Sequence, residues 1–587
     1  MEGDKGMIRV LMKSIREYKK PSILAPLLVS MEVIMECIIP FVVARLINQI
    51  KGGCDLGMII RYGMILIVMA GLSLSFGAGA GFNCATASCG FARNLRKDMF
   101  YRIQTYSFEN IDKFSTSSLV TRMTTDVTNV QMAYMMLVRL AFRSPLMLIF
   151  SATMAIIMGG KMALIFVIVI PILAVSLFLV MKSVTPIFKN VFKKYDALNN
   201  SIQENIKGMR VVKSYVRQEY EKAKFERSAE DVCADFTRAE KILALNNPMM
   251  QFCLYVAMIF VLSFGSYTII TSGGMDLDVG QFSALLVYNF QILMSLMMFS
   301  MVFVMVTMAE ESAKRIAEVL MEETTLHNPE HPVMEVADGS IDFDNVSFRY
   351  SEHAEKMALA NIDLHIKSGE TIGIIGGTGT SKSTLIQLIP RLYDVTTGSV
   401  KVGGVDVRDY DIETLRNQVA VVLQKNILFS GSIKDNLRWG DQNATDAQMK
   451  EVCELAQADE FVMQFPHQYT THIEQGGANV SGGQKQRLCI ARALLKKPKI
   501  LILDDSTSAV DTKTDALIRK AFSEYIPTTT KIIIAQRVSS VQDADRILVM
   551  DGGTIKNIGT HEELLKTSSI YREVYESQNR AGGEENE

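Results

Sequence analysis

Six long apolar runs in the first half of the chain constrain its fold more than any other feature. They cover residues 21–48, 58–85, 134–159, 161–183, 248–272 and 279–307 of the 587-residue sequence. Each run is long enough to supply the ~20 apolar residues with which a helix crosses ~30 Å of hydrocarbon. We therefore expect an α-helical transmembrane domain with six spans.

The loops between the runs predict how this domain is oriented. The two long loops, 86–133 and 184–247, carry clusters of Lys and Arg, whereas loop 273–278 carries neither. Since Lys and Arg are retained on the cytoplasmic side, both long loops and both termini are expected in the cytoplasm. The helices should extend into these loops and turn near Thr116–Thr121 and Arg210–Arg217.

Composition supports a chain with a membrane part and a soluble part. Apolar residues make up 48% of the sequence, yet charged residues still reach 21%. A net charge of -2 gives no reason to expect a nucleic-acid partner. Residues 1–20 have the pattern of an amphipathic segment on the membrane surface, and no cleavable signal peptide is expected.

The eight cysteines suggest neither a zinc site nor disulfides, because they include no CxxC pair. We expect them to be small buried residues in a reduced compartment. They are Cys37, Cys54, Cys84, Cys89, Cys233, Cys253, Cys453 and Cys489.

Several charged residues fall inside the apolar runs, and four of them form two pairs at helical spacing. Glu32 and Glu36 share one helix face, and Arg139 and Arg143 have the same spacing in the third run. One interpretation is that a glutamate pairs with Arg143 or that these turns lie outside the membrane. The other is that Glu32 and Glu36 attract cationic substrates in a central cavity.

The sixth run is rich in methionine. Flexible, polarizable methionines suit a surface that accepts many apolar shapes, but they also pack ordinary helices. The run contains Met294, Met297, Met298, Met301, Met305 and Met308, of which Met294, Met298 and Met301 are candidate substrate contacts.

The sequence pattern changes after the sixth run. A transmembrane domain at 1–309 is followed by a polar connector at 310–338, and short β-type runs then alternate with helical ones. This alternation predicts an α/β domain over 339–580, and 581–587 form a polar tail.

A phosphate-binding loop is predicted early in the α/β domain. Between two apolar runs, the string GGTGTSKST places a Gly-rich loop ahead of a helix that opens on Lys382. Loop N–H groups and a helix N-terminus converge on an anion, which predicts nucleotide binding. The candidate residues are Gly376, Gly377, Thr378, Gly379, Thr380, Ser381, Lys382, Ser383 and Thr384.

Two further motifs complete the nucleotide chemistry. Asp504 ends a later apolar strand, where its carboxylate can hold Mg²⁺ together with the Ser383 hydroxyl. The string VSGGQKQR begins at Val480, and its Ser481, Gly482, Gly483 and Gln484 open another helix. One domain does not need two binding sites for the γ-phosphate. The second anion-binding helix N-terminus is therefore expected to complete a nucleotide site on another domain, in a head-to-tail pair.

Taken together, the phosphate loop, VSGGQ and the strand aspartate resemble the ATP-binding cassette (ABC) transporters, and the whole chain resembles an exporter half-transporter. The resemblance implies that Tyr350 stacks on adenine and that Gln424 reaches the metal and the attacking water. Ser508–Asp511 match the loop that crosses the dimer interface. Glu474–Gly477 match the segment that meets the partner's cytoplasmic loops, so the two expected turns resemble coupling helices.

Three positions around the γ-phosphate depart from the family pattern. Asp505 stands where a catalytic Glu is expected, and its side chain is one methylene shorter. A carboxylate withdrawn by ~1.5 Å no longer reaches the attacking water as a general base. Gln536 replaces a His and cannot carry an imidazolium charge. Ser381 replaces a Gly, and its Cβ narrows the approach to the phosphates.

These departures predict a chain that binds MgATP and hydrolyses it poorly, while its VSGGQ completes a competent site on a different partner chain. This resembles the degenerate-site subunit of bacterial heterodimeric multidrug exporters in the cell membrane. Two alternatives remain: a homodimer in which Asp505 is a weak base, and an ATP-gated regulator or channel. The apolar, Met-bearing spans favour hydrophobic or amphipathic small molecules as substrates.

Overall fold

The computed structural model describes residues 2–351, 354–506 and 509–583. The chain divides into two compact units. A helical unit comprises Met1–Thr105 and Phe114–Glu322, and an α/β unit comprises Tyr106–Lys113 and Glu323–Glu587. A short segment from the first half of the chain therefore belongs to the second unit.

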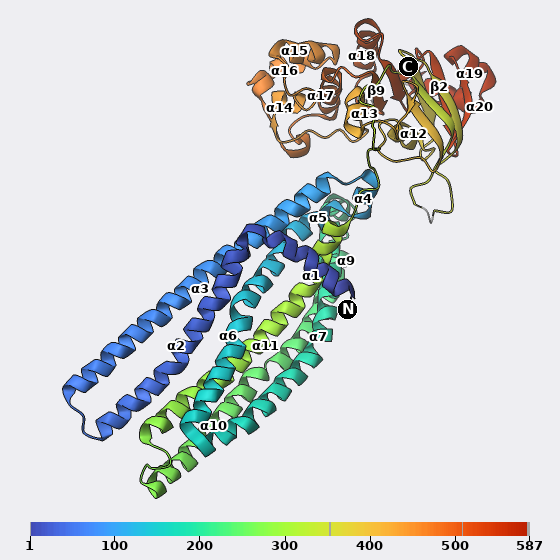
Figure 1. The fold of residues 1–587 in the computed structure, drawn as a ribbon. Coiled ribbons are helices and arrows are strands. Elements are labelled where there is room, and N and C mark those ends of the chain that lie inside the picture. Colours follow the sequence, from blue (N-terminus) through green and yellow to red (C-terminus); the bar gives the residue numbers. More distant parts are fainter. Residues whose placement is uncertain (1, 352–353, 507–508, 584–587) are drawn as a thin grey trace. The chain divides into compact units, whose positions relative to one another are not determined.

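Long helices dominate the helical unit (Figure 1). They are α2 Lys19–Lys51, α3 Leu56–Gln104, α6 Val127–Gly159, α7 Leu164–Lys207, α9 Gln218–Leu243, α10 Asn246–Ser272 and α11 Val279–Met321. The short elements are α1 Glu2–Met12, η1 Lys13–Tyr18, α5 Thr116–Thr121, the π-helical turn η2 Arg122–Asp126, η3 Gly160–Ala163 and α8 Met209–Ser214. The 49 residues of α3 span about 74 Å at 1.5 Å per residue, so this helix extends far beyond its apolar part.

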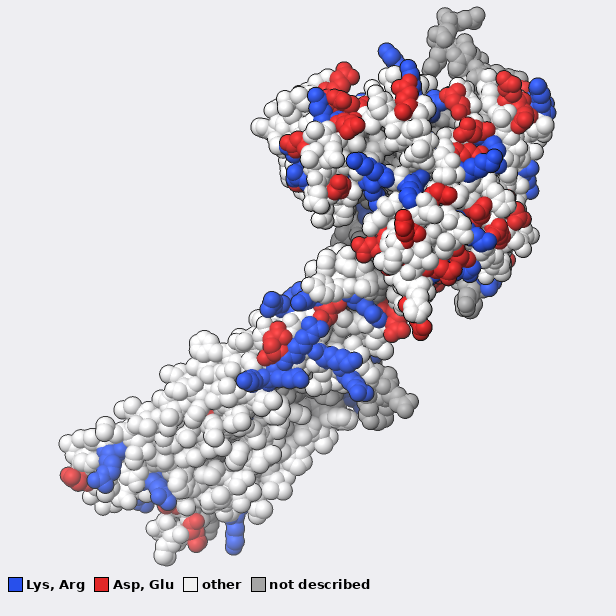
Figure 2. Space-filling view, turned by 45° about the horizontal axis from the view of Figure 1, so that its top comes forward, with Lys and Arg blue, Asp and Glu red and all other residues white. Residues whose placement is uncertain are grey.

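Five helical stretches are long and apolar enough to cross a membrane, where the sequence predicts six. They are Gly6–Lys51, Leu56–Gln104, Thr116–Phe188, Gln218–Ser272 and Val279–Met321. The third stretch contains both expected runs, 134–159 and 161–183, because the short turn η3 joins α6 directly to α7. At Gly160 the backbone leaves the helical conformation, with φ +47° and ψ −118°. In Figure 2 the helical unit has charged side chains near its two ends and a broad uncharged surface between them.

Helix α11 forms the centre of the helical unit's core. Its Tyr288 is fully buried and donates a hydrogen bond to the Cys37 carbonyl over 2.8 Å. Near the start of α11, a Cβ on Gly280 would lie 2.0 Å from the Ala44 carbonyl oxygen. Only glycine permits this approach of α11 to α2.

The N-terminal segment folds back on α3. The Asn94 side chain donates to the Ser14 carbonyl over 3.0 Å, and both Ser14 and Arg16 bond the Asp98 carboxylate. Leu11 and Ile15 are buried. One side of the expected amphipathic segment is thus taken up by contacts within the protein.

The connector begins later than the sequence predicts. Helix α11 continues through residue 310 to Met321, so the first part of the expected connector 310–338 is helical. This extension is held against α6 and η2, because Arg315 makes a bidentate ion pair with the buried Asp126 at 2.6 and 2.8 Å. At the other end, helix α20 Ser569–Gly583 runs into the expected polar tail 581–587, of which 584–587 lie outside the described residues.

The α/β unit contains a central sheet of order β12-β11-β3-β10-β9-β6 and an antiparallel sheet of order β2-β1-β4-β5. Strands β11, β3, β10, β9 and β6 are parallel. The central strands are β3 Thr371–Gly376, β6 Val419–Val422, β9 Ile500–Asp504, β10 Thr530–Ile534, β11 Arg546–Asp551 and β12 Thr554–Gly559. The second sheet has β1 Ile341–Phe348, β2 Leu359–Ile366, β4 Thr397–Val402 and β5 Val405–Asp406, and a small pair has β7 Gly431–Ser432 and β8 His472–Ile473.

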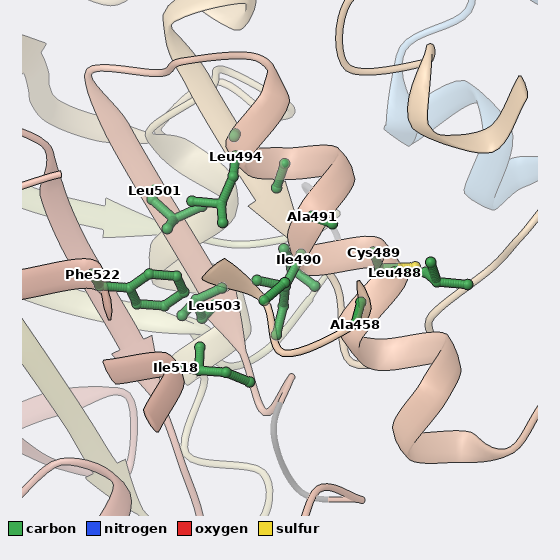
Figure 3. Close-up of a cluster of buried hydrophobic side chains, with 14 of the residues drawn as sticks. Ala458, Leu488, Cys489, Ile490, Ala491, Leu494, Leu501, Leu503, Ile518 and Phe522 are labelled. Atoms are coloured by element: carbon green, nitrogen blue, oxygen red, sulfur yellow. The ribbon is translucent and has the colours of Figure 1, made fainter. Parts of the chain in front are cut away.

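Helices cover the central sheet and bury its apolar strands. Figure 3 shows α17 Gly482–Leu495 and α18 Thr512–Tyr525 packed around β9. Leu494 of α17, Leu501 of β9 and Phe522 of α18 all belong to one buried cluster. The remaining helices are α12 Lys382–Leu388, α13 Ile412–Gln418, α14 Ile433–Leu437, α15 Asp446–Leu455, α16 Asp459–Gln464 and α19 His561–Thr567, with short turns η4 Gln468–Thr470, η5 Gln475–Gly477 and η6 Val538–Ser540.

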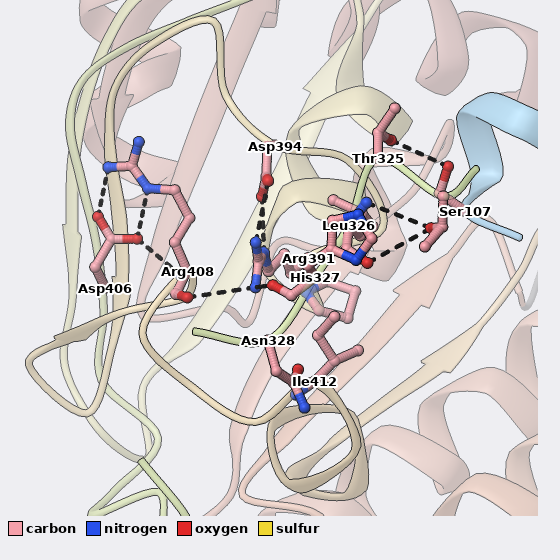
Figure 4. Close-up of polar contacts among 12 residues, drawn as sticks. Ser107, Thr325, Leu326, His327, Asn328, Arg391, Asp394, Asp406, Arg408 and Ile412 are labelled. Atoms are coloured by element: carbon pink, nitrogen blue, oxygen red, sulfur yellow. Dashed lines mark hydrogen bonds and ion pairs between the residues drawn. The ribbon is translucent and has the colours of Figure 1, made fainter. Parts of the chain in front are cut away.

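Residues 325–328, which lead into the α/β unit, are held by polar contacts (Figure 4). Thr325 hydrogen-bonds to Ser107 at 3.2 Å, and Arg391 donates to the His327 carbonyl over 3.2 Å. Asn328 then accepts from the Ile412 N–H over 3.0 Å. These contacts fix residues 325–328 on the surface of the α/β unit.

Helix α4 Phe108–Lys113 also belongs to the α/β unit. Its Phe108 and Asp112 both contact Tyr393. The turns expected near Thr116–Thr121 and Arg210–Arg217 are the short helices α5 and α8, which belong to the helical unit.

All eight cysteines are free. Five are buried as expected, but Cys89 and Cys233 are exposed and Cys54 is partly exposed. Among the described residues, no group of three or more His, Cys, Asp or Glu side chains is arranged to hold a metal ion.

Candidate nucleotide site

The strand order brings the candidate nucleotide residues to one edge of the central sheet. The order β3-β10-β9-β6 places the phosphate loop, Gln536, Asp504 with Asp505, and Gln424 after adjacent parallel strands. Because the carboxyl ends of parallel strands meet at one edge, residues from four distant parts of the sequence form one site there.

The phosphate loop explains why position 381 favours glycine. Ser381 is the residue before α12, and its φ of +66° lies in the left-handed region. Gly379 has a similar φ of +81°, and a Cβ there would meet nothing within 4 Å. A residue with a Cβ pays a conformational free-energy cost in this left-handed region.

Lys382 lies along the same loop. Its ammonium donates to the carbonyls of Gly376 and Gly377 at 2.9 and 2.7 Å. Burial lowers the pKa of Lys382, and the charges of Asp504 and Asp505 oppose that shift. A cation held between backbone carbonyls and two carboxylates is suited to contact a polyphosphate.

Asp504 faces Ser383 across the gap between β9 and the loop. Burial raises the pKa of Asp504 and the charge of Asp505 adds to this rise, while the nearby Ser383 side chain and Lys382 oppose it. Two carboxylates side by side in a buried site favour binding of a positive charge.

Asp505 is held by two glutamines. Gln536 donates to its Oδ2 over 2.8 Å, and Gln424 lies 3.5 Å from the same oxygen. Its own φ of +49° turns the backbone sharply at the end of β9. Burial raises the pKa of Asp505, and the bonds from Gln424 and Gln536 oppose the rise. All three departures from the family pattern, Ser381, Asp505 and Gln536, thus lie at one edge of the sheet.

Tyr350 lies beside the phosphate loop within an aromatic cluster. Its hydroxyl bonds Thr384 Oγ1 at 2.9 Å, and its ring meets Phe348 and Tyr393 at centroid distances of 4.9 and 5.3 Å. The side chain remains 46% exposed. The cluster thus orients an accessible aromatic ring next to the loop, as adenine stacking requires.

The VSGGQ motif opens a long helix with an exposed N-terminus. Ser481 accepts from the Gln484 N–H over 3.3 Å, and Gln484 Oε1 accepts from the Ser481 N–H over 3.0 Å, which forms a capping box. Ser481 and Gly482 are exposed. A Cβ on Gly483 would come within 2.9 Å of the Ala509 carbonyl oxygen, so glycine is needed there.

The two segments that the resemblance assigns to partner contacts flank this helix. Lys485 of α17 donates to the Gly476 carbonyl over 2.7 Å and so fixes the segment Glu474–Gly477. In the other segment, Ser508 lies outside the described residues, while the Ala509 N–H donates to Gln486 Oε1 over 3.1 Å. Asp511 caps α18 through the Thr514 N–H.

Comparison with known proteins decides the family. The ABC transporter transmembrane region matches residues 22–296, and the ABC transporter domain matches residues 359–508. A Bacillus subtilis protein named "Uncharacterized ABC transporter ATP-binding protein YfiB" is 36% identical over 571 residues, which cover 97% of this chain and 98% of that protein. The chain belongs to the ABC transporters.

Two further relatives refine the comparison. The transporter is 30% identical to the ATP-dependent lipid A-core flippase of Desulfotalea psychrophila over 487 residues, which cover 83% of this chain and 84% of that protein. Its fold matches a bacterial Atm1-family ABC exporter with ATP bound, with a TM-score of 0.82 at 22% identity over 96% of this chain and 98% of that chain. The chain is thus an ABC transporter with an ATPase domain and the fold of an ABC exporter.

In the helical unit of the transporter, the intramembrane charges form an ion-pair set. Arg143 lies 2.6 Å from Glu32 Oε1 and 2.8 Å from Glu36 Oε2. This is the pairing that the sequence offers as an alternative to substrate attraction. Of the candidate methionines, Met294 packs against the buried core, Met298 is half-buried and Met301 is exposed.

One residue of the site escapes sequence reasoning. Tyr393 donates to Asp112 Oδ2 of α4 over 2.6 Å, and its ring contacts both Phe108 of α4 and Tyr350. Burial raises the pKa of Tyr393, and the Asp112 carboxylate adds to this shift. An aromatic residue soon after the phosphate-loop helix is a weak signal, since it predicts only a buried ring.

Proposed function

We propose that the transporter is one half of a heterodimeric exporter, with an ATP site that holds MgATP and hydrolyses it weakly. The proposal rests on the length and the hydrogen bonding of the Asp505 side chain. Its carboxylate is shorter than the expected Glu, and its Oδ2 accepts a 2.8 Å bond from Gln536. A base engaged in this way is poorly placed to polarise a water beside the γ-phosphate.

The remaining residues fit ATP and Mg²⁺. The Ser383 side chain is close enough to Asp504 to lower its pKa, and hydroxyl and carboxylate oxygens are hard ligands suited to Mg²⁺. Gln424 is close enough to Asp505 to join them. Bound Mg²⁺ would neutralise phosphate charge, while Lys382 and the loop hold the phosphates and Tyr350 orients the base.

The VSGGQ motif supports the second half of the proposal. Its capping box, the close approach of Gly483 to Ala509 and the bond from Lys485 to Gly476 keep the exposed N-terminus of α17 ordered. In a head-to-tail dimer this surface would complete the partner's ATP site. The ATP site of this chain would then hydrolyse ATP weakly, while the partner's ATP site would remain active.

The proposed transport domain has six spans, with α6 and α7 crossing separately, and cytoplasmic termini. We expect its substrates to be hydrophobic or amphipathic small molecules drawn from the lipid phase. The similarity to a lipid A-core flippase supports an amphipathic substrate. The substrate contacts proposed are Met294, Met298 and Met301, with Glu32 and Glu36 setting a preference for cations.

Purification from the native membrane tests the proposal. A second half-transporter of similar size is expected to co-purify, and Glu→Gln at that partner's catalytic base is expected to abolish most ATP hydrolysis. Brisk hydrolysis and transport by this chain alone would favour the homodimer. Flux that continues without ATP hydrolysis would favour a channel.

A further inference from the structure

The C-terminal helix α20 packs against the loop that carries Gln536. Its Tyr571 is fully buried, and the Tyr571 hydroxyl bonds His561 Nδ1 at 2.7 Å. Val574 and Tyr575 pack against the same buried cluster that includes Val538 and Val541 of the loop. The helix is therefore anchored in the α/β unit, next to the nucleotide site.

One side chain of α20 binds this loop twice. Gln578 Oε1 accepts a hydrogen bond from the Val538 N–H over 2.9 Å, and Gln578 Nε2 donates to the Gln536 carbonyl over 2.7 Å. A single amide thus bridges the two peptide groups on either side of Arg537. Because both partners are backbone groups, the bridge does not depend on which side chain stands at position 536.

The bridge determines where the side chain at position 536 points. The loop leaves β10 at Ile534, and the Gln536 side chain reaches Asp505 Oδ2 at 2.8 Å. On the Asp505 side, the backbone is fixed by a bond from the Asp505 N–H to the Ile534 carbonyl over 2.9 Å. Gln578 supplies the matching restraint on the other side of residue 536.

We propose that Gln578 is a positioning residue for the nucleotide site, which acts by fixing the backbone at 536–538 so that the side chain at 536 faces Asp505. This inference rests on the proposed function, because it concerns the same weak site. Movement of α20 would release residue 536, so the C-terminal helix can regulate contact with the γ-phosphate without altering the phosphate loop.

The test compares three variants of the full-length chain, assembled as it is purified. Each is made in the Asp505→Glu, Gln536→His double variant, which is expected to hydrolyse ATP. Gln578→Ala removes both bonds. Gln578→Glu keeps an acceptor for Val538 but sets a carboxylate against the carbonyl of residue 536. Ser577→Ala changes the neighbouring exposed residue of α20 and serves as the matched control.

Gln578→Ala is expected to lower kcat for ATP by about tenfold to a hundredfold with KM unchanged, because the reacting groups lose position while the phosphate loop is intact. Gln578→Glu should give a smaller loss, and Ser577→Ala none. Amide hydrogen exchange at 535–541 should rise in Gln578→Ala without added ATP.

Unchanged kcat and exchange in Gln578→Ala would overturn the inference. Equal losses in Ser577→Ala would also overturn it, since they would show a general effect of the helix. The proposed function fails on a different result, brisk hydrolysis by the unmodified chain alone. The hydrogen-exchange comparison requires no turnover, so the two failures can be told apart.

Discussion

Gln536 donates a 2.8 Å hydrogen bond to Asp505, so two residues that depart from the family pattern satisfy each other. An amide and a short carboxylate form a stable neutral-to-charged pair across adjacent strand ends. Such a pair holds the site in one arrangement, but it provides neither a longer base nor a cationic partner for phosphate.

Restoring both family residues should therefore restore hydrolysis. Asp505→Glu with Gln536→His is expected to raise phosphate release by the purified transporter about tenfold or more, because a placed general base contributes at least that much. Adding Ser481→Ala should abolish the gain if a second copy supplies the motif. Each single substitution should fall short of the pair, and a double variant no faster than the parent would contradict this account.

The phosphate loop yields a prediction about stability. Ser381→Gly should stabilise the α/β unit by about 1 kcal/mol, because Ser381 occupies a left-handed conformation that costs a side chain roughly that amount. Thermal unfolding of the purified transporter measures the change. Gly379→Ala is the matched control, since a Cβ there meets nothing and only the φ of +81° is unfavourable. It should destabilise by a similar amount. A Ser381→Gly variant no more stable than the parent, or a Gly379→Ala variant no less stable, would refute the conformational explanation.

Much of the site is predictable from sequence, since each motif directly follows a strand. The adjacency of apolar run and polar tip at Asp504 is a local pattern, and parallel strands bring such tips together. Tertiary contacts, in contrast, cannot be predicted from a local pattern. The helical extension of α11 to Met321 looks like a polar linker, yet it buries Ile316 and Val319 and pairs Arg315 with Asp126. The φ of Ser381 and the Gln578 bridge are set by chain paths that no single segment specifies.

A partly buried ion pair makes the α/β unit sensitive to acid. Arg546 binds Glu370 through two bonds of 2.5 and 2.9 Å, which tie the turn before β3 to the start of β11. Burial opposes ionisation of Glu370, but Arg546 and the Lys367 N–H outweigh it and hold the pKa of Glu370 below its usual value of 4.5. Its stabilisation is therefore present above the unfolded-state pKa and is lost as pH falls through the folded-state pKa.

Glu370→Gln should accordingly lower the stability of the unit by about 2 kcal/mol at pH 7, and the difference from the parent should shrink as pH falls through the lowered folded-state pKa of Glu370. Unfolding measured across this pH range checks both statements. The exposed pair Asp344–Lys401 offers a control, because Asp344→Asn should have a much smaller effect. A pH-independent difference for Glu370→Gln would assign its effect to packing alone.

Tyr393 links α4 to the aromatic cluster around Tyr350. Tyr393→Phe keeps the rings and removes the 2.6 Å bond to Asp112, so it should loosen α4 by about 1–2 kcal/mol without changing ATP affinity. Hydrogen exchange over 106–113 and ATP binding measure the two effects. Asp112→Asn keeps an acceptor and should loosen α4 less. Equal exchange in all three proteins would show that the hydroxyl bond contributes little.

Arg143 balances two carboxylates inside the helical unit, at 2.6 Å from Glu32 and 2.8 Å from Glu36. Arg143→Gln leaves both charges without their partner and should cost about 3 kcal/mol, seen as a large drop in the yield of monodisperse transporter. Arg139→Gln, one turn away, is the matched control, because the described part of the chain shows no ion pair for Arg139. The triple variant with Glu32→Gln and Glu36→Gln should recover the yield, since it removes the charges together with their partner.

The triple variant also separates the two roles of the glutamates. If Glu32 and Glu36 serve the structure alone, the recovered protein should export cationic and neutral compounds in the same ratio as the parent. A shift of that ratio toward neutral compounds would show that the carboxylates also contribute to substrate selection. Failure of the triple variant to recover would contradict the charge-balance explanation, because the two carboxylates are then removed together with their partner.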